Sequence, residues 1–223
     1  MSVQRASLSP PSVEVIPLNL EHDGQPQFEP SFFEPYRGFL PEPDAEETYP
    51  PFTGVEGPFC KPLDWAQDIN DYFQTYLATV QQETKLPIRL YQPGRFGHNL
   101  WERSPNSNWH ISAFDYITDE PRFKCMMLND VIGCDTVTRE ELLCICRIMV
   151  KVLRYYKNHL VAPVMVLSFM GPRHGRILVA HHNGDSLVIG KSELFDFQHK
   201  NIDAFKTFAQ WWCSSGVGNT MAK

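Results

Sequence analysis

The sequence predicts an α+β domain over residues 61–223, with helices packed on a mixed, largely antiparallel sheet. Three observations support this prediction. Amphipathic stretches with helical spacing alternate with short apolar runs, the apolar runs are bounded by turn residues, and one pair of runs is joined by a hairpin turn. A folded unit of about 160 residues buries roughly 70% of its unfolded surface, so it can hold a core without disulfides or metal.

Three segments repeat apolar side chains every three or four positions, as an amphipathic helix does. Asp64 followed by Gln67 predicts a capping box at the start of the first segment. Thr138 and Glu141 predict a second capping box at the start of the next. The predicted helices cover approximately residues 64–83, 138–159 and 202–213.

Short apolar runs between these helices predict strands. The run that ends at Gly171 and Pro172 is apolar throughout, which predicts a strand buried on both faces. The four predicted strands cover residues 88–91, 109–114, 123–128 and 163–169.

Asn183 and Gly184 predict a type I′ hairpin with a two-residue turn. The register that follows places His182 opposite Asp185, where the two side chains could form a hydrogen bond. Both faces of the hairpin are apolar near its middle, so we expect it to be covered on both sides. The two predicted strands are 176–182 and 185–189.

Residues 1–60 differ in composition from the remainder. They contain 11 of the 18 prolines, together with ten acidic and two basic residues, which gives a charge of −8 against +2 for residues 61–223. Proline at this density breaks helices and removes ladder donors, so the segment is predicted to be an extended or disordered arm.

The arm is rich in aromatic residues, unlike ordinary disordered tails. Two interpretations remain open. The aromatic side chains fill grooves on the chain's own domain, or they form a linear motif that binds a protein partner. The candidate partner-binding residues are Phe28, Phe32, Phe33, Tyr36 and Phe39.

The formal charge of −6 argues against a general nucleic-acid binder. No stretch is long and apolar enough to span a membrane, and the first residues lack the apolar region of a secretory signal. We therefore expect a cytoplasmic or nuclear protein whose six cysteines are reduced thiols. The sequence predicts no cofactor, and its oligomeric state stays open.

Common catalytic motifs are absent, including phosphate-binding glycine loops and the nucleophile elbow. One constellation resembles a metal-dependent nuclease, because Asp115 ends one predicted strand and Lys124 lies on the next. Asp119 and Glu120 lie between them, and carboxylates of this kind bind Mg²⁺. The element order is similar to the restriction-endonuclease-like (PD-(D/E)XK) core. However, Arg122 stands where that motif requires an acid.

A second candidate site is the predicted loop that contains Arg173, His174 and Arg176. Two guanidinium groups and an imidazole between glycines could bind a phosphate or a carboxylate. The alternative is a cationic loop that only connects two strands.

The C-terminal third resembles a set of uncharacterised proteins of filamentous fungi, across approximately residues 138–219. That set has no assigned activity, so the resemblance implies a lineage and an intracellular location but no site residues. The segments that carry the resemblance are 163–172, 176–180, 194–197 and 204–212.

Taken together, these observations predict a non-enzymatic interaction protein that uses the arm or the apolar groove beneath it. The alternative is a restriction-endonuclease-like domain, degenerate or active, with Asp115 and Lys124 as its catalytic residues. Only this alternative requires Mg²⁺.

Overall fold

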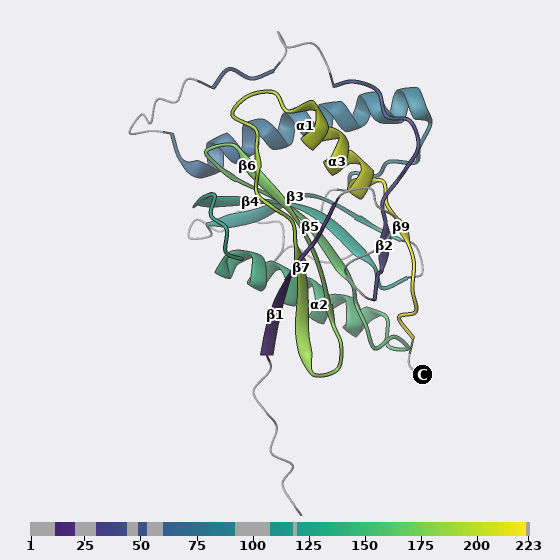
Figure 1. Cartoon of the computed structure of the whole chain (residues 1–223). Helices are drawn as coiled ribbons and strands as arrows, with labels where there is room; N and C mark the ends of the chain where they lie inside the picture. Colours follow the sequence, from purple (N-terminus) through teal and green to yellow (C-terminus); the bar gives the residue numbers. More distant parts are fainter. Residues whose placement is uncertain are drawn as a thin grey trace, which may run out of the picture.

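A computed structural model describes residues 12–20, 30–43, 49–52, 60–91, 108–117 and 120–221. Figure 1 shows a central sheet between two helical layers. Helices α1 (Pro62–Thr84) and α3 (Ile202–Trp212) lie on one face, and α2 (Arg139–Tyr155) lies on the other. The predicted α+β class is confirmed.

The main sheet is mixed, as predicted. Within the described residues it has seven strands in the order β1-β7-β6-β5-β4-β3, with the short β8 beside β6. The β1–β7 and β4–β5 pairs are parallel, and the other pairs in the sheet are antiparallel. The short strands β2 and β9 pair separately. The bounds are β1 Ser12–Pro17, β2 Phe33–Glu34, β3 Trp109–Tyr116, β4 Phe123–Ile132, β5 Val164–Gly171, β6 His174–His182, β7 Ser186–Lys191, β8 Phe195–Asp196 and β9 Ser215–Gly216.

The helix starts agree with the sequence at α2 and differ at α1. The predicted capping box of α2 is confirmed, because the Thr138 hydroxyl accepts from the Glu141 amide at 3.2 Å and the Glu141 carboxylate accepts from the Thr138 amide at 2.8 Å. Helix α1 begins earlier than predicted, with Lys61 as its N-cap and the Asp64 carboxylate accepting from the Lys61 amide. Pro62 starts the helix because its ring presets the backbone angle that the first turn requires.

The hairpin turn is centred one residue later than predicted. The Asn183 amide donates to the Ser186 carbonyl, and the Asn183 side chain accepts from the amides of Asp185 and Ser186. Gly184, with φ of +111°, therefore takes the first central position of the turn. His182 lies opposite Leu187 and not opposite Asp185, so the predicted contact between the two side chains is wrong. The shift in pairing is two residues, and each side chain keeps its predicted face.

Strand β5 forms the centre of the core, with every residue buried, as predicted for this apolar run. Its two faces contribute to two separate clusters. Phe169 faces the aromatic side of α1 and α3, where it lies 5.9 Å from Phe73 and 5.6 Å from Phe208 between ring centroids. Val164 and Val166 face α2 on the opposite side.

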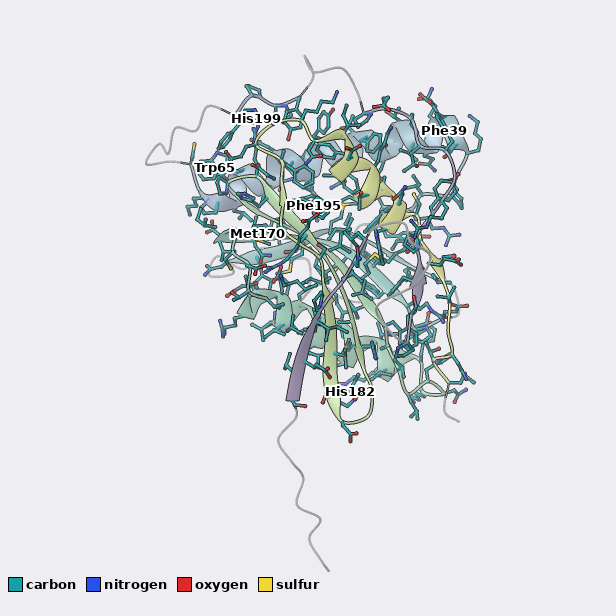
Figure 2. The ribbon with its side chains drawn as sticks, viewed as in Figure 1. Phe39, Trp65, Met170, His182, Phe195 and His199 are labelled. Atoms are coloured by element: carbon teal, nitrogen blue, oxygen red, sulfur yellow. The ribbon has the colours of Figure 1, made fainter. Side chains whose placement is uncertain are left out.

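The described parts of residues 1–60 lie extended on the domain. Strand β1 pairs with β7, and Phe32 and Phe33 are each 2% exposed. The Tyr36 amide donates to the Gln210 carbonyl at 2.9 Å. Phe39 differs, because it is 72% exposed and lies on the outside of the molecule (Figure 2). Phe28 lies outside the described residues. Phe32 and Phe33 could reach a partner only if this segment left the domain.

Buried His181 links the pH dependence of stability to this packing. His181 lies on β6, with its ring centroid 5.1 Å from that of Phe32. Burial, and secondly the neighbouring His182, lower the pKa of His181. Between this lowered pKa and the unfolded value of about 6.5, the unfolded chain binds more protons than the folded one. The contribution of His181 to the free energy of unfolding is therefore complete above the pKa of histidine in the unfolded chain. It declines as the pH falls below that pKa.

We predict that replacing His181 by Phe, which retains a ring beside Phe32, reduces the loss of unfolding free energy between pH 8 and pH 5. Urea unfolding across this range measures the loss. The control is His199→Phe, because His199 is exposed on a distant loop (Figure 2). If both variants keep the wild-type pH dependence, His181 is not the group responsible.

Candidate functional site

Four buried cations each pair with one acidic residue. All four side chains are 5% exposed or less, which is unusual for charged groups and requires compensation by hydrogen bonds. The pairs are Arg122–Glu120, Lys124–Asp115, Arg173–Asp68 and Arg176–Glu141.

Arg176 holds the connection between β4 and α2. Its Nε donates to Glu141 at 2.9 Å, and a second bond joins its terminal nitrogen to the same carboxylate at 2.5 Å. The remaining donors bind the carbonyl oxygens of Cys134 and Thr136 at 2.9 and 2.7 Å. Glu141 therefore belongs to the capping box of α2 and is also the counter-ion of Arg176.

Arg173 binds the arm in the same way. It has a left-handed backbone with φ of +63° and donates to the carbonyl oxygens of Pro50 and Pro51 and to the carboxylate of Asp68. His174 pairs with Asp196 across β6 and β8. Each of the three residues predicted to bind an anion is therefore held by contacts with other parts of the chain. Among the side-chain atoms of these three residues, Arg173 Nε and His174 Nδ1 lack a hydrogen-bond partner within the described residues. The anion site stays a prediction.

Asp115 and Lys124 meet, as the nuclease alternative requires. They are directly opposite in the β3–β4 register, and Lys124 Nζ lies 3.2 Å from Asp115 Oδ2. The same ammonium donates to the carbonyl oxygens of Trp212 at 2.7 Å and Ser214 at 3.3 Å. Lys124 thus supplies hydrogen bonds to carbonyls at the C-terminal end of α3 and just after it, where carbonyls have no partner within the helix.

A nuclease also needs a second carboxylate beside Asp115. Glu120 pairs with Arg122 instead, and Asp119 lies outside the described residues. No three side chains of His, Cys, Asp or Glu in the described part of the chain gather closely enough to hold a metal ion.

A cavity of about 470 Å³ opens beside Asp115 and Lys124. Its walls come from the end of β3, from the segment that follows α1, and from the chain between α3 and β9. Sequence reasoning missed this cavity because no single segment contains it. The lining residues are Leu86, Pro87, Ile88, Arg89, Asp115, Tyr116, Ile117, Lys124, Trp212, Cys213, Ser214, Ser215 and Gly216.

Three buried polar atoms of the cavity residues lack a hydrogen-bond partner within the described part of the chain. They are Asp115 Oδ1, Trp212 Nε1 and Ser214 Oγ. Most buried polar atoms in folded proteins are paired, and an unpaired one costs about 1–3 kcal/mol. These three atoms are buried behind the cavity surface, so the cavity is a candidate binding site because of its lining residues.

Cys213 also lines the cavity, but its sulfur is a poor nucleophile. Burial raises the pKa of this thiol to about 11, a shift that Lys124 opposes and Asp115 increases. The thiolate is the nucleophilic form of cysteine, and it is scarce at neutral pH when the pKa is this high. A role for Cys213 as a nucleophile is therefore not supported.

No family model, curated protein or solved structure matches the chain. The resemblance to fungal proteins therefore stays a prediction, as does the restriction-endonuclease-like alternative. None of the helices in the described ranges is long and apolar enough to cross a membrane.

We predict that Arg176→Met lowers the free energy of unfolding by about 3–5 kcal/mol, because it leaves the Glu141 carboxylate buried without a counter-ion. The double variant Arg176→Met/Glu141→Leu should regain part of this loss. Chemical denaturation measures both values, with exposed Arg139→Met as the control. A single variant as stable as wild type would contradict the role assigned to this pair.

We predict that Cys213 reacts with iodoacetamide at least about 10-fold more slowly than the exposed Cys60 at pH 8, since little of its thiol is ionised. Peptide mapping by mass spectrometry after timed labelling measures both rates. Equal rates at the two cysteines would show that the Cys213 thiol is not protected in the folded chain.

Proposed function

We propose that this chain is a non-enzymatic interaction protein, and that it receives a group of its partner in the cavity beside Asp115. The observation that carries the proposal is the open cavity, which apolar and polar residues from separate segments of the chain line together. Sites of this kind bind the body of a ligand through apolar contacts and orient it through a few polar groups. The partner is taken to be a protein in the cytoplasm or nucleus.

The buried charges support a binding role over a catalytic one. Lys124 is engaged by Asp115 and by two carbonyl oxygens, so its ammonium is not available to move a proton or to bind a phosphate. The Cys213 thiol is protonated at neutral pH. The cavity therefore offers recognition groups without an activated nucleophile or base.

The arm contributes to the same site indirectly. Ser215 and Gly216 line the cavity, and they form β9, which pairs with Phe33 and Glu34 of the arm. The arm therefore supports one wall of the cavity. Phe39 is a second candidate contact, since it is largely exposed (Figure 2).

The nuclease-like alternative keeps one observation in its favour, the pairing of Asp115 with Lys124 on adjacent strands. Magnesium or manganese titration of the full chain tests it. Heat of binding that disappears in Asp115→Asn, with cleavage of DNA or RNA, would replace the interaction proposal.

We predict that Ser215→Trp blocks the cavity and abolishes partner capture, because Ser215 is exposed at the cavity rim. Affinity capture from native extract, with quantitative mass spectrometry, compares it with the wild-type full chain. Thr75→Trp adds the same ring at an exposed site on α1 and should capture the wild-type partners. Partners that survive Ser215→Trp but not deletion of Phe39 would move the interaction from the cavity to the arm.

A further inference from the structure

We infer that α2 and the turn after it form a second binding surface, which takes an acidic segment of a partner protein that carries an aromatic side chain. This surface goes beyond the proposed function, because it shares no residue with the cavity beside Asp115. Helix α2 lies on the face of the sheet opposite to α1 and α3 (Figure 1). Two features lead to the inference: a row of cations and an aromatic pocket at the end of that row.

The first feature is a basic face, formed by Arg147, Lys151, Arg154 and Lys157. The first three are four and three positions apart on α2, so they lie along one side of the helix. At a rise of about 1.5 Å per residue, they span about 10 Å. Lys157 follows in the turn after the helix. The guanidinium carbon of Arg147 lies 5.4 Å from the ring centroid of Trp109, and this contact holds its charge in one place.

The charge of this part of the chain is uniformly positive, because no acidic residue occurs in residues 142–184. Arg154 and Lys157 are exposed, and neither forms an ion pair with another residue in the described ranges. Burial lowers the pKa of the half-buried Lys151, and the neighbouring Arg147 lowers it further. Cations this close repel each other, and a carboxylate bound between them relieves the repulsion.

The second feature is a pocket of about 390 Å³ at the C-terminal end of α2. Aromatic rings form much of its wall. The ring centroids of Tyr155 and Tyr156 are 5.0 Å apart, and those of Tyr156 and His159 are 5.9 Å apart. A hydrogen bond of 2.8 Å between His159 Nδ1 and the Thr220 hydroxyl holds the turn against the C-terminal segment. The lining residues are Tyr155, Tyr156, Lys157, Asn158 and His159, none of which is acidic.

Lys157 belongs to both features, so the basic face leads into the pocket. Val150 and Tyr155 are each 49% exposed among these cations. Protein interfaces are enriched in tyrosine and arginine and have a polar rim, which is the combination found on this surface. A partner segment whose acidic residues pair with the basic face would place an aromatic side chain against the rings of the pocket. Aromatic pairs stabilise a contact beyond the area that they bury.

Charge favours a protein partner over a nucleic acid. The chain has a formal charge of −6, so a long polyanion would meet repulsion from most of the molecule. Proteins that bind DNA commonly contact about 6–10 phosphates, which is more than the basic face can neutralise. A short acidic segment needs only the cations of this one face.

Three fluorescein-labelled peptides test the chemistry of the partner. The first has four glutamates followed by a phenylalanine, the second replaces the glutamates by glutamine, and the third replaces the phenylalanine by alanine. Fluorescence anisotropy measures their affinities for the full chain. We expect the first peptide to bind at least about 10-fold more tightly than the second and at least about 3-fold more tightly than the third. Its affinity should fall as salt is added, because salt screens exposed charges.

Matched variants locate the peptide on the surface. Arg154→Gln/Lys157→Gln removes two exposed charges and should weaken binding of the first peptide at least about 5-fold. Arg37→Gln/Arg139→Gln removes the same charge from exposed arginines outside the basic face, and should keep the wild-type affinity. Tyr155→Ala should remove most of the preference for phenylalanine over alanine, which a loss of positive charge alone would not change.

Four results would overturn the inference. The first is an acidic peptide that binds no better than its glutamine form, or does not bind at all. The second is wild-type affinity in Arg154→Gln/Lys157→Gln, or a preference for phenylalanine that is absent or survives Tyr155→Ala. The third is tighter binding of an oligothymidine or of phosphatidylserine vesicles, which would assign the surface to another class of ligand. The fourth is loss of peptide binding in Ser215→Trp, which would place the peptide in the cavity beside Asp115.

Discussion

Buried cations that bond to backbone carbonyl oxygens hold the irregular parts of this chain in place. Arg122 is the most connected example, because its guanidinium reaches the arm at the Phe32 carbonyl and the C-terminal segment at the carbonyls of Val217 and Gly218. Irregular segments cannot satisfy these carbonyls within a helix or a ladder, and an unpaired carbonyl in the interior is costly. A planar guanidinium suits this role because it presents five donors in a fixed geometry.

The cavity is a consequence of this arrangement. Hydrogen bonds from Lys124 hold the end of α3 and the chain after it against β4. Hydrogen bonds from Arg122 hold the next few residues beside the arm. The segment between these two anchors passes over the end of β3 and leaves a space beside Asp115. Asp115, Trp212 and Ser214 each keep one buried polar atom there without a hydrogen-bond partner among the described residues. The shape of the cavity therefore depends on the same cations that fix the chain after α3.

The sequence predicted local structure better than it predicted the site. Helix α2, strand β5 and the hairpin strands follow from apolar spacing and capping residues, which are local signals. The sequence correctly predicts that Asp115 and Lys124 are neighbours. It does not distinguish a buried structural lysine from a catalytic one. Arg173 and Arg176 illustrate the same limit, because their acceptors lie 35 to 123 residues away in the chain. The cavity combines distant segments, so no local pattern could indicate it.

Amide hydrogen exchange in Arg122→Met tests whether a buried cation fixes segments that the sheet does not hold. The full-length variant is compared with wild type, residue by residue. We expect the Val217 amide, which donates to the Phe32 carbonyl at 3.1 Å, to lose protection while the amides of β5 keep theirs. Unchanged protection at Val217, or an equal loss throughout the sheet, would contradict it.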